Sequence, residues 1–129
     1  MRPKTENWLN IAQDDYEVAS QLFENKKYLY CLFFCQQAIE KAIKAVYYER
    51  NEETPPRKHN LISLAEDAGI FDELDRLNGD TLDTLSQCYI ESRYTEDRNA
   101  MARKCTKAFT ENILKKTGDI FEWLESQLK

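Results

Sequence analysis

The segment from Tyr28 to about Arg50 constrains the fold most, because it predicts a helix that other elements must surround. Its first two turns, YLYCLFFC, are apolar almost all round. The apolar positions then narrow to one face, at Ile39, Ala42, Ile43 and Val46. A helix that is apolar on every side is stable in water only when it is buried. The apolar run stops at Gln36, far short of the roughly 20 residues that cross a bilayer, so we predict the central helix of a core.

Helical periodicity extends to the rest of the chain. From Thr5 to about Asn25, apolar residues recur at the spacing of one helix face. The stretch NEETPPRKHN must be a loop, because its two prolines remove backbone donors and disfavour helix in the preceding residue. LISLAEDAG and FDELDRLNG both end in glycine, a common signal of a helix C-terminus, and predict one or two short helices.

Two further helices complete the predicted fold. Asp80 is expected to cap one of them, which carries Leu82 and Leu85 on its apolar side. The other is expected to follow SRYTED and to run as one element to about Leu128. Four substantial helices with no strand-like alternation predict an all-α fold, an antiparallel four-helix up-and-down bundle with a short extra helix. The length of 129 residues predicts one domain, residues 1–129.

Charge and cysteine usage exclude several classes of function. With 18 basic and 23 acidic residues, the net charge is −5, so any phosphate contact must be local rather than spread over the surface. The N-terminal residues turn acidic where a signal peptide is apolar, and we expect a cytoplasmic protein without a membrane segment. The four cysteines form no CxxC motif and lie in apolar patterns, which predicts buried thiols and neither a metal nor another cofactor.

Two polar features interrupt this otherwise apolar helical pattern. Gln37, Lys41, Lys44 and Tyr48 follow one another at three- and four-residue steps on the central helix, with Gln36 and Glu40 alongside. Such residues either face water or contact a ligand. His59, the one histidine, stands at a helix entrance, where it either packs and caps or acts as a proton-exchanging group.

The stretch SRYTEDR supplies two arginines where one helix ends and the next begins. Arg93 and Arg98, together with the backbone donors of the last helix, could converge on one anion. Tyr94 would pack its ring into the core and fix Arg93 beside it. The alternative is an internal salt bridge from either arginine to Glu91, Glu96 or Glu40.

These segments, taken in order, resemble the HEPN family, the higher eukaryotes and prokaryotes nucleotide-binding domain. The resemblance is carried by the run QQAIEKAIKA in the central helix, by His59 followed by Leu61, and by the pair Arg93–Tyr94. The first helix adds a further set of matching positions: Trp8, Ala12, Asp15, Ala19 and Leu22. The similarity extends from about Trp8 to Leu124.

The resemblance implies a helical bundle that dimerises and is linked to a small nucleotidyltransferase in toxin–antitoxin or stress systems. Many relatives are metal-independent ribonucleases that use an arginine and a histidine with four to six residues between them. Here the residues at that spacing after Arg93 are Arg98, Asn99 and Ala100, so the motif is absent. Arginine cannot replace the histidine, because it does not lose its proton near neutral pH.

We therefore predict a nucleotide- or nucleic-acid-binding module that forms a homodimer, works with a nucleotidyltransferase partner and has no catalytic activity alone. The predicted ligand-binding residues are Arg93, Tyr94, Arg98, Lys41, Lys44, Gln37 and His59. Two alternatives stay open. One is a ribonuclease in which folding brings His59 near Arg93. The other is a purely structural interaction bundle in which the polar stripe is an interface.

Overall fold

The computed structural model describes the backbone of residues 1–91 and 95–129, and the side chains of residues 1–89 and 98–129. The described helices are α1 (Pro3–Glu24), α2 (Tyr28–Asn51), α3 (Leu61–Asp67), α4 (Phe71–Glu91), α5 (Thr95–Lys104) and α6 (Lys107–Ser126). Within these residues there is no strand, so the predicted all-α class is confirmed. None of the described helices is both long and apolar enough to cross a membrane.

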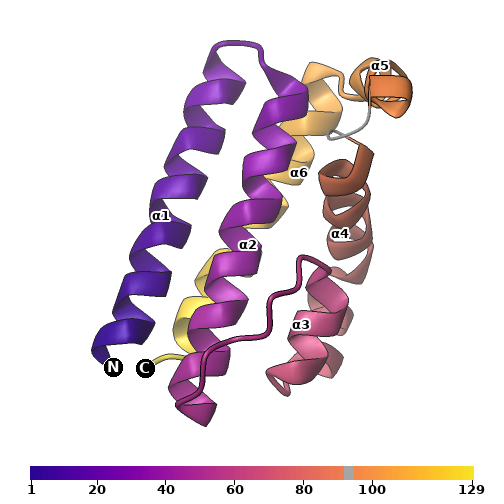
Figure 1. Ribbon diagram of the computed structural model, residues 1–129. Helices are drawn as coiled ribbons and strands as arrows, with labels where there is room; N and C mark the ends of the chain where they lie inside the picture. The colour runs from indigo at the N-terminus through magenta and orange to yellow at the C-terminus, as the bar shows by residue number, and fades with distance from the viewer. Residues whose placement is uncertain (92–94) are drawn as a thin grey trace.

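Helix α2 is the centre of the fold. Figure 1 shows α1, α2, α4 and α6 side by side with alternating direction, so that both chain termini lie at the same end. Helix α2 contacts each of the other described helices. Its residues Leu32, Cys35, Ile39 and Ile43 are fully buried, which follows from the apolar positions that the sequence places around this helix.

The proline segment is the loop between α2 and α3, as predicted. Glu52 ends α2 in the left-handed conformation, with φ of 54°, and the chain then turns toward α3. Asn60 begins α3, because its side-chain oxygen accepts a hydrogen bond from the Ser63 N–H at 2.9 Å. The loop therefore delivers His59 to a fixed position beside α2.

The C-terminal region differs from the prediction of one continuous helix, which was wrong. Thr106 is extended, with φ of −70° and ψ of 165°, and separates α5 from α6. The Thr106 hydroxyl accepts a hydrogen bond from the Phe109 N–H at 3.2 Å and so caps α6. The prediction of one helix was based on apolar spacing. This spacing continues across the break, because α5 and α6 both bury residues against the same core.

Helix α4 combines two segments that the sequence divides. The backbone at Asn78 is non-helical, with φ of −154° and ψ of 44°, and the helix is kinked there. The predicted boundary between FDELDRLNG and the segment beginning near Asp80 corresponds to this kink. The four cysteines, which lie in α2, in α4 and after α5, are buried thiols, as predicted.

Candidate functional site

Polar side chains are buried along one face of α2. Gln36, Glu40 and Lys44 follow one another at four-residue steps, which places them on one side of the helix. Their exposed fractions are only 0%, 1% and 7%, respectively. Together with His59 from the loop before α3, they form a contact set that we call the Glu40 network. Because polar groups are costly to bury without partners, every member of this network should be hydrogen-bonded.

The Glu40 carboxylate is the acceptor at the centre of the network. Its Oε1 atom lies 3.0 Å from Nδ1 of His59 and accepts a hydrogen bond from Gln36 Nε2 at 3.1 Å. Its Oε2 atom accepts from the Lys44 amine at 3.2 Å. Burial alone would raise the pKa of Glu40, but the contacts with His59, Lys44 and Gln36 outweigh burial and lower it. The core therefore contains an ionised carboxylate that is stabilised by its neighbours.

His59 joins the loop to α2 by both its backbone and its ring. Gln36 Nε2 donates to the His59 carbonyl oxygen at 2.9 Å, and the ring contacts Glu40. Because an ionised carboxylate only accepts hydrogen bonds, Nδ1 is the ring nitrogen that donates to Glu40, and Nε2 lies outside this contact. The ring stacks on Tyr89 of α4 with centroids 4.9 Å apart, while 53% of the His59 side chain stays exposed.

The other predicted residues of α2, Gln37 and Lys41, lie next to the Glu40 network. The Lys41 amine donates to Gln37 Oε1 at 3.0 Å and lies 3.6 Å from Glu40 Oε2 and 4.0 Å from Asp15 Oδ2. Burial raises the pKa of Asp15, and Lys41 offsets part of this rise. Lys44 lies over the Trp8 ring at 5.6 Å. Both lysines thus contact carboxylates within the fold.

The structure does not bring all of the predicted site residues together. Gln37, Lys41, Lys44 and His59 gather around Glu40, whereas Arg98 contacts Tyr30 near the start of α2. At a rise of about 1.5 Å per residue, Tyr30 and Lys44 are roughly 20 Å apart along α2. Arg93 and Tyr94 lie outside the described residues, so the predicted site corner at these two positions stays a prediction.

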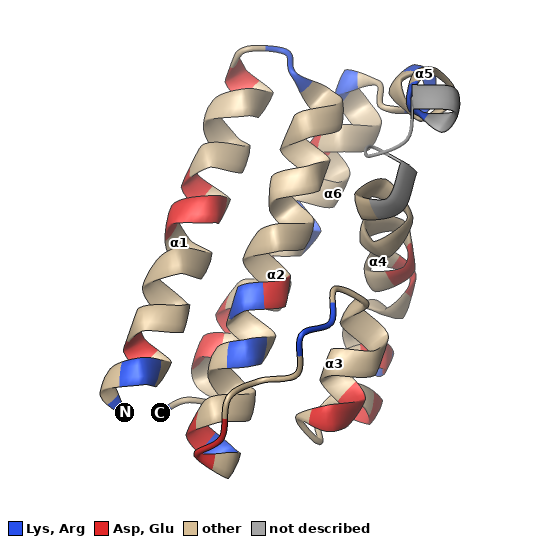
Figure 2. Cartoon of the chain, viewed as in Figure 1, with Lys and Arg blue, Asp and Glu red and all other residues tan. Residues whose placement is uncertain are grey.

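Arg98 forms part of a positively charged surface at one end of the bundle. Its guanidinium donates to the Tyr30 hydroxyl and lies 5.2 Å from the centre of the Tyr30 ring. A cavity of about 260 Å³ is lined there by Arg98, Tyr30, Lys26 and Lys27. We call Lys26, Lys27 and Arg98 the basic end. Figure 2 shows Lys and Arg positions on both the α1–α2 turn and α5 at this end.

Sequence reasoning missed two features of this surface. Tyr30 belongs to the run YLYCLFFC, for which a buried helix was predicted, but 43% of it is exposed, and it holds the Arg98 side chain. Lys26 and Lys27 were not singled out. The signal was present as two lysines directly before two tyrosines, in KKYLY, because basic and aromatic residues together are typical of phosphate- and base-binding surfaces.

Comparison with known proteins identifies a family and a similar fold. The sequence matches the family described as the HEPN domain over residues 5–127. The structure is similar to the crystal structure of TT1696 from Thermus thermophilus, with a TM-score of 0.81 and 24% sequence identity. The alignment covers 98% of this chain and 99% of that one. Among curated proteins there is no match.

The Glu40 network predicts a pH-dependent loss of stability in Glu40→Gln. Removing the charge leaves Lys44 buried without its carboxylate, so we expect a loss of about 3 to 5 kcal/mol in the free energy of unfolding at neutral pH. Because folding lowers the Glu40 pKa, its contribution is present above the ordinary value of 4.5 and is lost as the pH falls through the lower folded-state pKa. Urea denaturation from pH 7 downward measures both effects.

The matched control is Glu66→Gln, because Glu66 is an exposed acid of α3. We expect this change to alter stability little at any pH. Equal losses in the two variants, or a deficit of Glu40→Gln that does not shrink at low pH, would show that Glu40 is not an ionised centre of the core.

Proposed function

Since the chain belongs to the HEPN domain family, we propose that it is a nucleotide- or nucleic-acid-binding module without catalytic activity of its own. In this proposal it forms a homodimer and works with a minimal nucleotidyltransferase partner in a toxin–antitoxin or stress-response system. The observation that carries ligand binding is the basic end, where Arg98 is held over an exposed tyrosine. The partner and the biological system follow from the family resemblance.

The basic end combines the two contacts that nucleotides require. Lys26, Lys27 and Arg98 supply positive charge around one cavity, while the whole chain has a net charge of −5. Phosphate groups are bound by such local clusters, and bases stack on exposed aromatic rings with little dependence on sequence. Tyr30 supplies such a ring. Because its hydroxyl accepts from Arg98, the guanidinium is already positioned before a ligand arrives.

Lys41 and Lys44 of α2 are less suited than the basic end to binding a phosphate group. Lys44 is only 7% exposed and donates to Glu40, and Lys41 lies between Asp15 and Glu40. A phosphate at either lysine would compete with a carboxylate that is already in place. We therefore assign the phosphates of the ligand to Arg98 and, by the sequence prediction, to Arg93. A ligand long enough to extend along α2 would be needed to contact the other predicted residues, Gln37, Lys41, Lys44 and His59.

Self-association is proposed from the family resemblance and from the apolar residues of the first two helices. Ile11 of α1 remains 44% exposed in the single chain and lies outside the basic end. Apolar and aromatic side chains of this size are commonly covered at symmetric interfaces. Sedimentation velocity at micromolar concentration should detect a dimer, and a monomer alone would contradict the proposal.

Loss of the Arg98 side chain should weaken ligand binding without unfolding the protein. For Arg98→Ala we expect binding of a short single-stranded oligoribonucleotide to weaken by roughly 1.5 to 3 kcal/mol, the range for a hydrogen bond to a charged group. The difference should shrink in high salt, because exposed charges are then screened. Fluorescence anisotropy at two salt concentrations measures it, and Arg76→Ala in the exposed part of α4 is the matched control.

Arg93→Ala should behave like Arg98→Ala, whereas Tyr94→Ala should mainly lower the melting temperature. If the parent protein binds neither oligoribonucleotide nor ATP, or if Arg76→Ala weakens binding equally, the basic end is not the ligand site.

A second candidate function is a metal-independent ribonuclease that uses His59 with Arg93. The observation in its favour is the contact of Nδ1 with Glu40, which orients a half-exposed ring and leaves Nε2 outside that contact. A carboxylate that orients a histidine in this way is a common feature of general-base sites. The distance from His59 to Arg93 would decide between the two functions, and Arg93 lies outside the described residues.

A cleavage assay separates this candidate from simple binding. We expect the purified protein to leave a labelled RNA intact in the presence of EDTA, because the expected histidine after Arg93 is missing. Robust cleavage that is lost in His59→Ala but kept in Lys58→Ala would reverse the order of the two candidates.

A further inference from the structure

A groove lies between α1 and α6, on a face that the proposed function does not use. It has a volume of about 620 Å³, within the range of about 300 to 1,000 Å³ that is typical of ligand sites. Helices α1 and α6 both pack on α2 and approach each other around Tyr16. We call this feature the α1/α6 groove.

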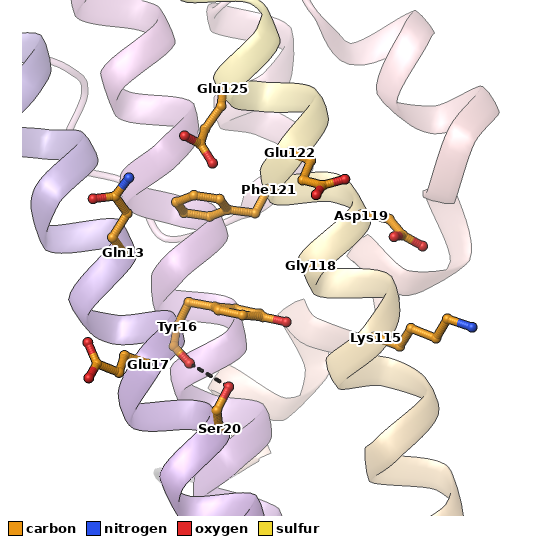
Figure 3. Close-up of a pocket in the computed structure, with 10 residues that line it drawn as sticks. All are labelled: Gln13, Tyr16, Glu17, Ser20, Lys115, Gly118, Asp119, Phe121, Glu122 and Glu125. Carbon is orange, nitrogen blue, oxygen red and sulfur yellow. Dashed lines mark hydrogen bonds between the residues drawn. The ribbon is translucent and has the colours of Figure 1, made fainter.

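The floor of the α1/α6 groove is aromatic. Tyr16 extends from α1 toward α6 and Phe121 extends from α6 toward α1, as Figure 3 shows. Their ring centroids are 6.0 Å apart with an interplanar angle of 30°. The Tyr16 hydroxyl donates to the Leu114 carbonyl oxygen at 3.3 Å. It fits against α6 because residue 118 is glycine, since a Cβ atom there would lie only 2.7 Å from the hydroxyl oxygen.

The rim of the groove is acidic. Four carboxylates line it, from Glu17, Asp119, Glu122 and Glu125, against a single lysine, Lys115. The Lys115 amine points away from the two aromatic rings in Figure 3. Burial is the largest cause that raises the pKa of Tyr16, and the charges of Asp119 and Glu122 are among those that raise it further. The negative charge of the rim therefore acts on the aromatic floor.

An apolar floor between two helices and a negative rim together define the kind of occupant. A basic amphipathic helix matches this surface, because its apolar side chains would cover the rings and its Lys or Arg side chains would face the carboxylates. A second copy packed groove to groove does not match it. Such a symmetric pair would place the acids of one groove opposite the same acids of the other.

We propose that the α1/α6 groove is a docking site for a basic amphipathic helix of a partner protein. The helix places an apolar side chain on Tyr16 and Phe121 and cationic side chains beside Glu17, Asp119, Glu122 and Glu125. This site is separate from the basic end, which attracts ligands of the opposite charge. The molecule thus binds an anionic ligand and a cationic protein segment at two different surfaces.

The probe for this site is a synthetic helical peptide of about 15 residues, roughly four turns, with leucines on one face and lysines beside them. Titration into the ¹⁵N-labelled full chain should shift the amide signals of Gln13, Gly118 and Phe121. The peptide should bind at least about tenfold more weakly to Glu122→Lys, a difference of about 1.4 kcal/mol. A second peptide with serines in place of the leucines should also bind more weakly.

The matched control is Asp83→Lys, which changes the net charge equally at an exposed position of α4. We expect this control to alter peptide binding by less than about twofold, because Asp83 does not line the groove and salt weakens the interaction of exposed charges with distance. Absence of shifts at the groove, or equal weakening in Glu122→Lys and Asp83→Lys, would overturn the proposal. It would also be overturned if sedimentation showed a dimer that Glu122→Lys abolishes, since a second copy would then occupy the groove.

Discussion

The ionised carboxylate of Glu40 is the constraint on which the remaining structure depends. It is 1% exposed, so its charge is tolerated only because three side chains from α2 and the following loop are arranged around it. The same contacts fix other parts of the fold. Gln36 holds the backbone of the proline loop, His59 joins that loop to Tyr89 of α4, and Lys44 reaches Trp8 of α1. A single buried charge therefore connects α1, α2, α4 and the loop before α3.

This arrangement also determines where charge remains available for binding. Lys41 and Lys44 face carboxylates inside the bundle, whereas Lys26, Lys27 and Arg98 line a cavity at the other end of α2. Exposed acids line the α1/α6 groove instead. A chain with a net charge of −5 can thus present one basic surface and one acidic surface. Because the attraction of an ion depends on local rather than total charge, the two surfaces can select opposite partners.

The sequence predicted the helices well because their apolar spacing is regular, and α2 was correctly identified as the central helix. It could not show the break at Thr106, since a capping hydroxyl leaves the apolar period of the flanking helices unchanged. The polar stripe of α2 was recognised, but spacing alone could not tell a solvated face from a buried network. That distinction depends on His59 and Trp8, which are distant in sequence. Tyr30 and Arg98 meet only through the packing of α5 on α2, so no local pattern could pair them.

In the proposed function, the buried Glu40 network maintains the fold and the basic end binds the ligand, and NMR mapping tests this division directly. A short single-stranded oligoribonucleotide would be added to the ¹⁵N-labelled protein, and the amide signals would be followed residue by residue. We expect the largest shifts at Lys26, Lys27, Tyr30 and Arg98, while the signals of Gln36, Glu40 and Lys44 stay in place. Large shifts around Glu40 and His59 with none at the basic end would contradict this division.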